Sequence, residues 1–413
     1  MTQQTNAAYD LVVFGATSFV GRILTRYLLD TYGLNREVSW AIAGRSEARL
    51  TGLKGDLGPA AQDLPVVIAD ASDDQSLAAL CQQARVVVST VGPYALYGEP
   101  LVRACVDTGT DYCDLTGEVQ WIRRMIQRYE AQAQASGARI VHCCGFDSIP
   151  SDLGVWFLQQ QAEQTFGRPC QDVRMRVKVA KGGLSGGTVA SMINIAREAA
   201  SDSALRKELA NPFSICPPEH RSEARQPSLK SPQYDPTFDA WLAPFVMGAI
   251  NTRVVHRSNA LMQARYGREF TYDEAMMTGR GLAGRARAYG VTAALAAFFA
   301  ASALRPSRWL LEKWVPQPGE GPSPEAQEAG FYDLRFVGRT EDGRTLITKV
   351  TGDRDPGYGS TARMLGEAAM TLAFDIPADQ AGGFWTPASL LDGALLERLR
   401  SRAGLSFEVL ETR

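Results

Sequence analysis

The feature that most constrains the fold is a short apolar run that leads through a glycine-bounded turn into a helical pattern. Residues 11–14 (Leu-Val-Val-Phe) are continuously apolar, which is typical of a strand buried on both faces. From Val20 to Thr31, apolar residues recur at helical spacing. Strand and helix patterns keep alternating over residues 1–150, which predicts a parallel sheet with helices on its faces.

The turn after this strand is a variant of the dinucleotide-binding fingerprint. We expect Gly15 to make the tight turn and Gly21 to let the helix pack close to the strand, while Ser18 replaces the middle glycine. The helix N-terminus would offer free N–H groups to a pyrophosphate. The alternative is an ordinary strand–helix turn in a domain that binds no nucleotide. The predicted cofactor-binding residues in the turn are Gly15, Ala16, Thr17, Ser18, Phe19, Val20 and Gly21.

The end of the second predicted strand, residues 38–43, indicates which dinucleotide would bind. Enzymes that use NAD usually carry an acidic residue here to bind the ribose 2′-hydroxyl, but Gly44, Arg45 and Ser46 follow instead. Arg45 can pair with a 2′-phosphate and Ser46 can add a hydroxyl, so the sequence favours NADP(H). A solvated arginine at a turn is the alternative. Asp70, after the third predicted strand, is a further cofactor-binding candidate, facing the adenine.

The later strand ends carry the candidate catalytic residues. The fourth predicted strand leads into Val91, Gly92 and Pro93, which we expect beside the ribose and nicotinamide, because the carboxyl ends of the strands face the ligand. Tyr94 and Tyr97 would point a phenol at the same region, or else pack on the sheet edge. Acidic residues after the next strands would bind substrate or water, or cap helices. The predicted catalytic residues are Tyr94, Tyr97 and Asp147; Asp114 and Asp152 are the other acidic candidates.

Composition excludes several function classes. The formal net charge of -2 leaves no basic footprint for nucleic acid and no strong attraction to an anionic membrane. Seven cysteines without CxxC spacing indicate a reducing compartment, here the cytoplasm. Three scattered histidines give no metal site, and residues 1–10 do not form a signal peptide.

The 413 residues exceed what one core usually supports, so two domains are expected. We predict an α/β chain with an N-terminal Rossmann domain, a doubly wound parallel sheet over residues 1–165. A second, α+β domain for substrate binding and dimerisation would follow over residues 166–413. Alternating patterns at 172–180, 331–338 and 345–351 predict strands, the last two forming a hairpin around Asp342-Gly343.

Two segments of the second half leave alternatives open. Residues 183–187 match the Gly-x-Ser-x-Gly elbow of hydrolases, but the preceding strand alternates and the Rossmann half would be unexplained. Residues 288–304 carry no charge and are flanked by arginines. This predicted helix could contact the inner face of a membrane peripherally, be buried, or form a homodimer contact.

Taken in order, these motifs resemble the saccharopine dehydrogenase-like oxidoreductases, especially the trans-acting enoyl reductase branch. The resemblance implies an NADPH-binding Rossmann domain, a second α/β domain, and lipid-related work that includes reducing a polyketide-derived double bond, with association with membranes or lipid droplets. The motifs that carry it lie at 15–21, 43–46, 91–94, 97–98, 112–118, 145–152, 318–322, 386–388 and 396–399.

The leading interpretation is therefore an NADPH-dependent oxidoreductase that reduces an enoyl or similar group of a lipid-like small molecule. One alternative is a saccharopine-type dehydrogenase acting on an amino-acid adduct, whose site would need cations for several carboxylates. The other is a non-catalytic NADP-binding scaffold at membranes.

Overall fold

The computed structural model divides the chain into two compact units, each built on one sheet. The first unit takes residues 1–146, 317–321 and 358–403, and the second takes 147–316, 322–357 and 404–413. The structure describes residues 7–34, 37–182, 186–220, 222, 224–303 and 321–413.

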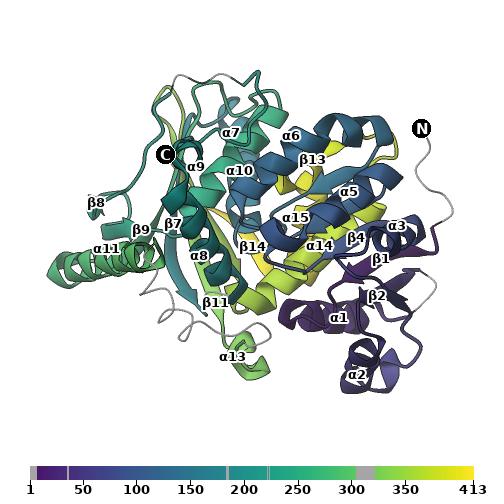
Figure 1. The fold of residues 1–413 in the computed structure, drawn as a ribbon. Helices are drawn as coiled ribbons and strands as arrows, with labels where there is room; N and C mark the ends of the chain where they lie inside the picture. Colours follow the sequence, from purple (N-terminus) through teal and green to yellow (C-terminus); the bar gives the residue numbers. More distant parts are fainter. Residues whose placement is uncertain (1–6, 35–36, 183–185, 221, 223, 304–320) are drawn as a thin grey trace. The chain divides into compact units, whose positions relative to one another are not determined.

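The first unit contains a seven-stranded parallel sheet in the order β3-β2-β1-β4-β5-β6-β13 (Figure 1). The first six strands have the Rossmann order, and β13 extends the sheet beyond β6. The predicted α/β fold is confirmed. Its central strands are apolar and buried, as expected from the sequence, and Val12, Val13 and Val87 are fully buried. The strands are β1 (Tyr9–Phe14), β2 (Trp40–Gly44), β3 (Val66–Ile68), β4 (Ala84–Ser89), β5 (Asp111–Asp114), β6 (Arg139–Val141) and β13 (Gly383–Trp385).

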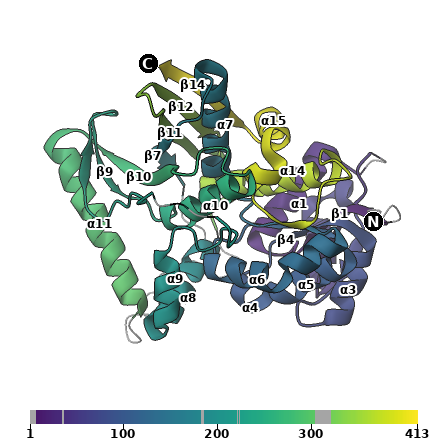
Figure 2. The same cartoon turned by 90° about the horizontal axis from the view of Figure 1, so that it is seen from above.

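Helices cover both faces of this sheet. In Figure 2, α1, α14 and α15 lie on one side of β1 and β4, and α3, α5 and α6 lie on the other. Glu367 of α14 ties the first group together, because it accepts hydrogen bonds from Tyr27 and Tyr32 of α1 at 2.5 and 2.8 Å. The helices are α1 (Phe19–Tyr32), α2 (Glu47–Leu57), α3 (Asp74–Gln83), α4 (Tyr94–Tyr97), α5 (Glu99–Thr108), α6 (Val119–Ser136), α14 (Thr361–Phe374) and α15 (Asp392–Arg402).

The second unit contains a mixed seven-stranded sheet in the order β14-β12-β11-β7-β10-β9-β8. The β7–β10 pair is parallel, and the other neighbours are antiparallel. The predicted hairpin is confirmed, with β11 pairing β12. The strands are β7 (Asp172–Lys181), β8 (Gln233–Asp235), β9 (Ala240–Pro244), β10 (Thr271–Gly279), β11 (Phe331–Arg339), β12 (Thr345–Gly352) and β14 (Leu405–Thr412); the helices are α7 (Ile149–Phe166), α8 (Gly186–Ser201), α9 (Ser203–Ala210), α10 (Gly248–Leu261), α11 (Gly281–Ala303) and α13 (Pro324–Glu328).

The division into units differs from the boundary at 165/166 expected from the sequence. Residues 358–403 join the first unit because β13 pairs with β6 and α14 packs against β4 and β5. The unit boundary after Phe146 falls just before α7, which packs against β11 and β12 of the second sheet.

Three sequence features lie partly outside the described residues. Of the Gly-x-Ser-x-Gly match, positions 183–185 are not described, nor are positions 318–320 of the motif at 318–322. The uncharged segment forms the end of α11, and its last residue, 304, is also outside. Within the described ranges, none of the helices has the length and apolar character needed to cross a membrane.

Candidate functional site

The turn between β1 and α1 requires glycine at both of its ends. Gly15 has a φ of +85°, and a Cβ there would lie 2.6 Å from Val91 Cγ2. A Cβ on Gly21 would lie 2.3 Å from the carbonyl oxygen of Gly15. Both distances are well below ordinary contact, so the two glycines allow the tight turn and the close approach of α1 to it.

Ser18 caps α1 at the position where the fingerprint usually has its middle glycine. Its φ of −68° and ψ of 165° are extended values open to any residue, so the backbone conformation does not require glycine. The Ser18 hydroxyl accepts from the Gly21 N–H at 3.0 Å and lies 2.9 Å from the Thr90 hydroxyl. Serine therefore stabilises the helix start and joins it to the loop after β4.

The N-terminus of α1 keeps donors available to an anion. The backbone N–H groups of Thr17, Phe19 and Val20 have no acceptor among the described residues. At a helix start such groups carry partial positive charge and bind phosphate oxygens. The predicted pyrophosphate position is thus compatible with the geometry of the turn.

The end of β2 presents a cation and a hydroxyl. Arg45 is exposed, and Ser46 caps α2 by accepting from the Arg49 N–H at 3.4 Å. A hydroxyl that accepts one bond can still donate its proton, so Ser46 remains able to donate to a phosphate oxygen. The carboxylate of Asp70 accepts from the Ser72 N–H and hydroxyl at 2.9 and 2.8 Å, which lowers the pKa of Asp70, with a smaller contribution from Arg45.

A buried carboxylate that the sequence analysis did not single out shapes the loop after β4. Glu118 is fully buried, and its two oxygens accept from the backbone N–H groups of Tyr94 and Ala95 at 2.8 and 3.1 Å. It thereby caps the single-turn helix α4 from the loop between β5 and α6. Glu118 is the last residue of the motif at 112–118, so the sequence marked its position. The sequence could not show which backbone N–H groups its side chain binds.

The two tyrosines of α4 have different surroundings. Tyr94 is buried, and its hydroxyl donates to the Ser89 carbonyl at 3.0 Å. Burial, followed by the charge of Asp114, raises the pKa of Tyr94 well above its ordinary value. Tyr97 is half exposed, and Leu96 beside it is 57% exposed. The loop Val91–Pro93 therefore leads into an apolar surface that carries one accessible phenol.

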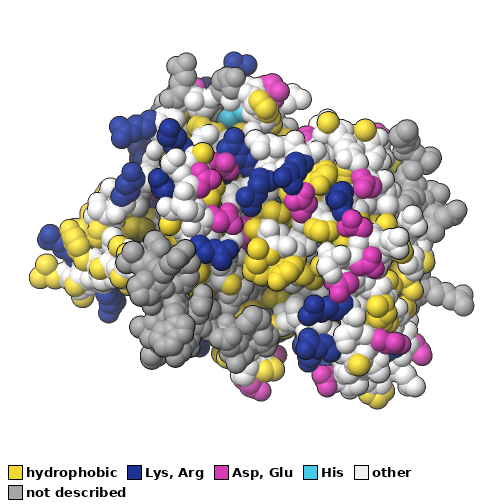
Figure 3. All heavy atoms as spheres, in the orientation of Figure 1, with side chains coloured by type: hydrophobic (Ala, Val, Ile, Leu, Met, Phe, Trp, Pro, Cys, Tyr) yellow, Lys and Arg dark blue, Asp and Glu magenta, His cyan; other side chains and the backbone are white. Residues whose placement is uncertain are grey.

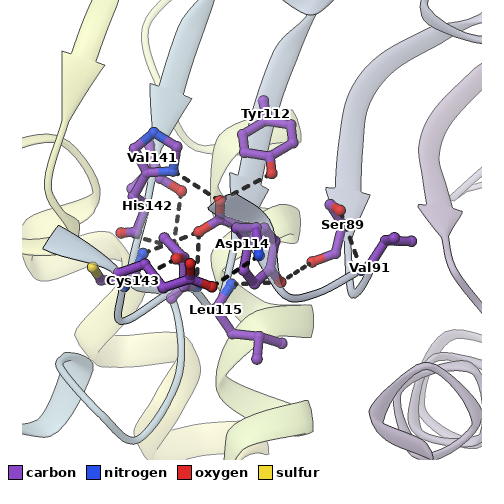
Figure 4. A network of polar contacts seen from close by, with 12 residues as sticks. Ser89, Val91, Tyr112, Asp114, Leu115, Val141, His142 and Cys143 are labelled. Carbon is purple, nitrogen blue, oxygen red and sulfur yellow. Dashed lines mark hydrogen bonds and ion pairs between the residues drawn. The ribbon is translucent and has the colours of Figure 1, made fainter. Parts of the chain in front are cut away.

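Asp114 is neither a helix cap nor an exposed ligand group. Its carboxylate is fully buried and joins the ends of β5 and β6 (Figure 4). One oxygen lies 2.9 Å from the Tyr112 hydroxyl and 2.8 Å from His142 Nδ1, and the other accepts from the N–H groups of Thr116 and Cys143 at 3.1 and 3.3 Å. Asp114 thus fixes the crossover loops beside the site.

The remaining acidic candidates belong to the second unit. Asp147 accepts from the Thr188 hydroxyl at 3.4 Å, and desolvation raises its pKa to about 6. Asp152 lies inside α7 and accepts from the Ser258 hydroxyl at 2.6 Å, so it is not a helix cap either. Within the part of the chain that the structure describes, no cluster of three or more His, Cys, Asp or Glu side chains could hold a metal ion.

These features define the class of protein. The first sheet has the Rossmann order, a glycine-bounded turn precedes its first helix, and Arg45 with no acidic residue follows β2, which is the pattern typical of domains that bind a phosphorylated dinucleotide. The first unit is an NADP(H)-binding domain, and the protein is an NAD(P)-dependent oxidoreductase with a small-molecule substrate.

Comparison with known proteins gives the family. The family model "Saccharopine dehydrogenase NADP binding domain" matches residues 11–141. A trans-acting enoyl reductase of Mycobacterium tuberculosis is 38% identical over 402 residues, covering 95% of both chains. Another M. tuberculosis protein, which carries that name provisionally, is 41% identical over 415 residues, covering 98% of both chains. The chain therefore belongs to the saccharopine dehydrogenase-like oxidoreductases, in the branch of the trans-acting enoyl reductases.

Solved structures support the fold. Saccharopine dehydrogenase (L-Glu forming) from Saccharomyces cerevisiae aligns with a TM-score of 0.54, covering 98% of this chain and 100% of that one. Its sequence is 13% identical, so the likeness concerns the fold and not the substrate.

Proposed function

We propose that the protein uses NADPH to reduce the carbon–carbon double bond of an enoyl group in a lipid-like substrate. The observation that carries this proposal is the match, over nearly the whole chain, to proteins named trans-acting enoyl reductases. The exposed apolar side chains of Leu96 and Tyr97, directly after the loop Val91–Pro93, support an apolar substrate.

Each part of the first unit has a role in this reaction. The N–H groups at the start of α1 hold the pyrophosphate, and Arg45 with Ser46 binds the 2′-phosphate that distinguishes NADPH from NADH. Val91, Gly92 and Pro93 support the ribose and nicotinamide. Bound NADPH supplies a hydride to the electron-poor carbon of the substrate, and the adjacent carbon takes a proton.

The proton donor we favour is Tyr97. A general acid must reach the substrate, and Tyr97 is half exposed, whereas the Tyr94 hydroxyl is buried and donates to the Ser89 carbonyl. We assign Tyr94 a positioning role in the loop. Asp147, with its pKa of about 6, is the second candidate donor, because a carboxyl group with that pKa holds a proton over part of the near-neutral range.

The test is NADPH consumption by the purified full chain with a long-chain enoyl thioester, with the saturated thioester as matched control. We expect oxidation of NADPH only with the enoyl compound, and a product heavier by two hydrogens. Consumption with a saccharopine-like amino-acid adduct but not with any enoyl lipid would replace the proposal by the alternative activity. Tight binding of NADPH without turnover of either substrate class would favour the scaffold.

A further inference from the structure

The helix α11 has an apolar surface that the second unit leaves uncovered. Arg285 and Arg287 are its only charged residues, and it has no acidic ones. Gly284 and Ala288 are buried on the side that contacts β9 and β10. The helix also contacts α8, while the side opposite the strands is exposed, and Figure 2 shows none of the described helices or strands on that side. Helices that are apolar all round are normally buried, so this exposed side points to a missing partner.

The exposed side has the periodicity of a coiled-coil seam. Its residues follow one another at steps of four and three, the spacing that keeps one edge of a helix against another helix. All six are exposed, Leu282 by 83% and Tyr289 by 52%. In Figure 3, hydrophobic side chains gather over α11 with basic but no acidic groups beside them. The seam consists of Leu282, Ala286, Tyr289, Ala293, Ala296 and Ala300.

The seam complements itself in one orientation. If two copies pack antiparallel about a two-fold axis near position 291, Leu282 faces the partner's Ala300, and Tyr289 faces the partner's Ala293. Each large side chain then meets a small one, the arrangement that fills a helix interface without voids. In a parallel pair, Leu282 and Tyr289 would each face their own copy, and the alanine layers would be left underfilled.

The charges favour the same orientation. Arg285 and Arg287 both lie in the first third of α11. A parallel pair would bring the four cations together, whereas an antiparallel pair separates them. In that pair, Arg285 faces the partner's Ala297 and Arg287 faces the partner's Leu295, so neither arginine meets a cation across the seam. A two-fold symmetric contact of this kind is the commonest way in which identical subunits associate.

We propose that α11 packs antiparallel against α11 of a second copy of this chain and so forms a homodimer. Four of the six seam residues are alanines, which allow two helices to approach closely but add little affinity for a lipid surface. The seam from Leu282 to Ala300 is roughly 27 Å long. One helix pair buries less than the ~1,600 Å² of a standard interface, so we expect a dissociation constant on the order of micromolar.

Sedimentation of the full chain over a range of concentrations tests the dimer. We expect the natural protein to shift from monomer to dimer in the micromolar range. Ala293→Glu places a charge at the centre of the seam and should weaken association at least tenfold. Ala294→Glu is the matched control, because Ala294 is also exposed but lies about 100° further round the helix. Unfolding temperatures that match the natural protein would show that both variants fold.

Two outcomes would overturn the proposal. One is a natural protein that stays monomeric at concentrations far above micromolar, and the other is an Ala293→Glu variant that dimerises as well as Ala294→Glu. If the protein stays monomeric while sedimenting with anionic phosphatidylserine vesicles, and Ala293→Glu abolishes that binding, the surface meets a membrane and the dimer is refuted.

Cross-linking tests the orientation. The described cysteines are buried or partly buried, so a cysteine introduced on the seam is the accessible one. In an antiparallel dimer, the double variant Leu282→Cys, Ala300→Cys should form a disulfide-linked dimer under mild oxidation, while Leu282→Cys alone should not. Efficient cross-linking of the single variant would contradict the antiparallel arrangement.

Discussion

Replacing Glu274 by glutamine should remove one contribution to the pH dependence of stability, the loss of stability that Glu274 causes as pH rises. Glu274 lies on β10 with its side chain almost fully buried. Its oxygens accept from the Tyr272 hydroxyl at 2.7 Å and from Asn251 Nδ2 at 2.9 Å, and Ser151 is a further hydrogen-bond partner. These partners are neutral groups, so desolvation dominates and raises the pKa from 4.5 to about 7.

The magnitude follows from this difference. A raised pKa means that the folded protein holds the proton more tightly than the unfolded chain, so folding is penalised as pH rises from 4.5 through 7. The difference is about 2.5 pH units, and each unit corresponds to about 1.4 kcal/mol. Above pH 7, ionised Glu274 therefore lowers the free energy of unfolding by about 3 kcal/mol relative to pH 4.5 and below.

Glutamine keeps the shape of the side chain and cannot ionise. Its oxygen can accept from the Tyr272 hydroxyl. Its NH2 group can donate to Asn251 if the Asn251 side-chain amide flips and presents its oxygen. The flip is tolerated because the Ser148 hydroxyl, which now donates to Asn251 Oδ1, can accept from Asn251 Nδ2 instead. Urea unfolding of both proteins at pH 4.5 and pH 8 measures the effect. Titrations elsewhere in the chain cancel in the difference between the two proteins.

The quantity to compare is the free energy of unfolding of Glu274→Gln minus that of the natural protein. We expect this difference to be about 3 kcal/mol more favourable to the variant at pH 8 than at pH 4.5. Glu408→Gln is the control: Glu408 is exposed and its pKa is lowered, chiefly by a hydrogen bond from Lys349, so its replacement should give no gain at high pH. A Glu274→Gln effect that is the same at both pH values would refute the reasoning.

Three further predictions concern single side chains. Arg45→Ala should weaken NADPH binding roughly tenfold or more in fluorescence titrations, because a charged hydrogen bond to the 2′-phosphate is lost. NADH binding should stay nearly unchanged. Equal weakening of both would contradict the role of Arg45 in binding the 2′-phosphate. Desolvation, followed by the charges of His220 and Arg253, lowers the pKa of His256 to about 3, so the folded protein loses stability as pH falls below 6.5. His256→Phe should therefore reduce this loss of stability at acid pH. An unchanged acid-induced loss, measured by circular dichroism, would count against this explanation. Tyr97→Phe should lower kcat by at least tenfold with little change in NADPH affinity, and full activity in steady-state assays would remove Tyr97 as the proton donor.

Local pattern was sufficient to predict the first four strands of the first sheet. These strands are short, largely apolar and each followed by a turn, so their positions and the glycine turn at 15–21 could be predicted from the sequence. Residues 72–75 (Ser-Asp-Asp-Gln) have the sequence pattern of a capping box, but Asp73, and not Ser72, caps α3 by accepting from the Gln75 N–H, while the side chain of Ser72 donates to Asp70.

Contacts between distant segments could not be predicted. β13 joins the first sheet more than 200 residues after β6, and a three-residue strand carries too weak a pattern to reveal that pairing. Glu118 and Asp114 were visible as polar residues at a strand end, but their roles depend on backbone N–H groups from other loops. The buried polar residues Asn251 and His256 of α10 break the apolar pattern of a core helix, so no periodicity marked them as interior.

The central claim is hydride transfer from NADPH to an enoyl substrate. The most direct measurement uses NADPH that carries deuterium at the transferable position of the nicotinamide, incubated with the full chain and an enoyl thioester, followed by mass spectrometry of the product. The account predicts a saturated product that carries one deuterium on the former β-carbon and a solvent-derived hydrogen on the neighbouring carbon. Recovery of unlabelled, unreduced enoyl substrate while the labelled cofactor reduces an imine-forming amino-acid adduct would contradict it.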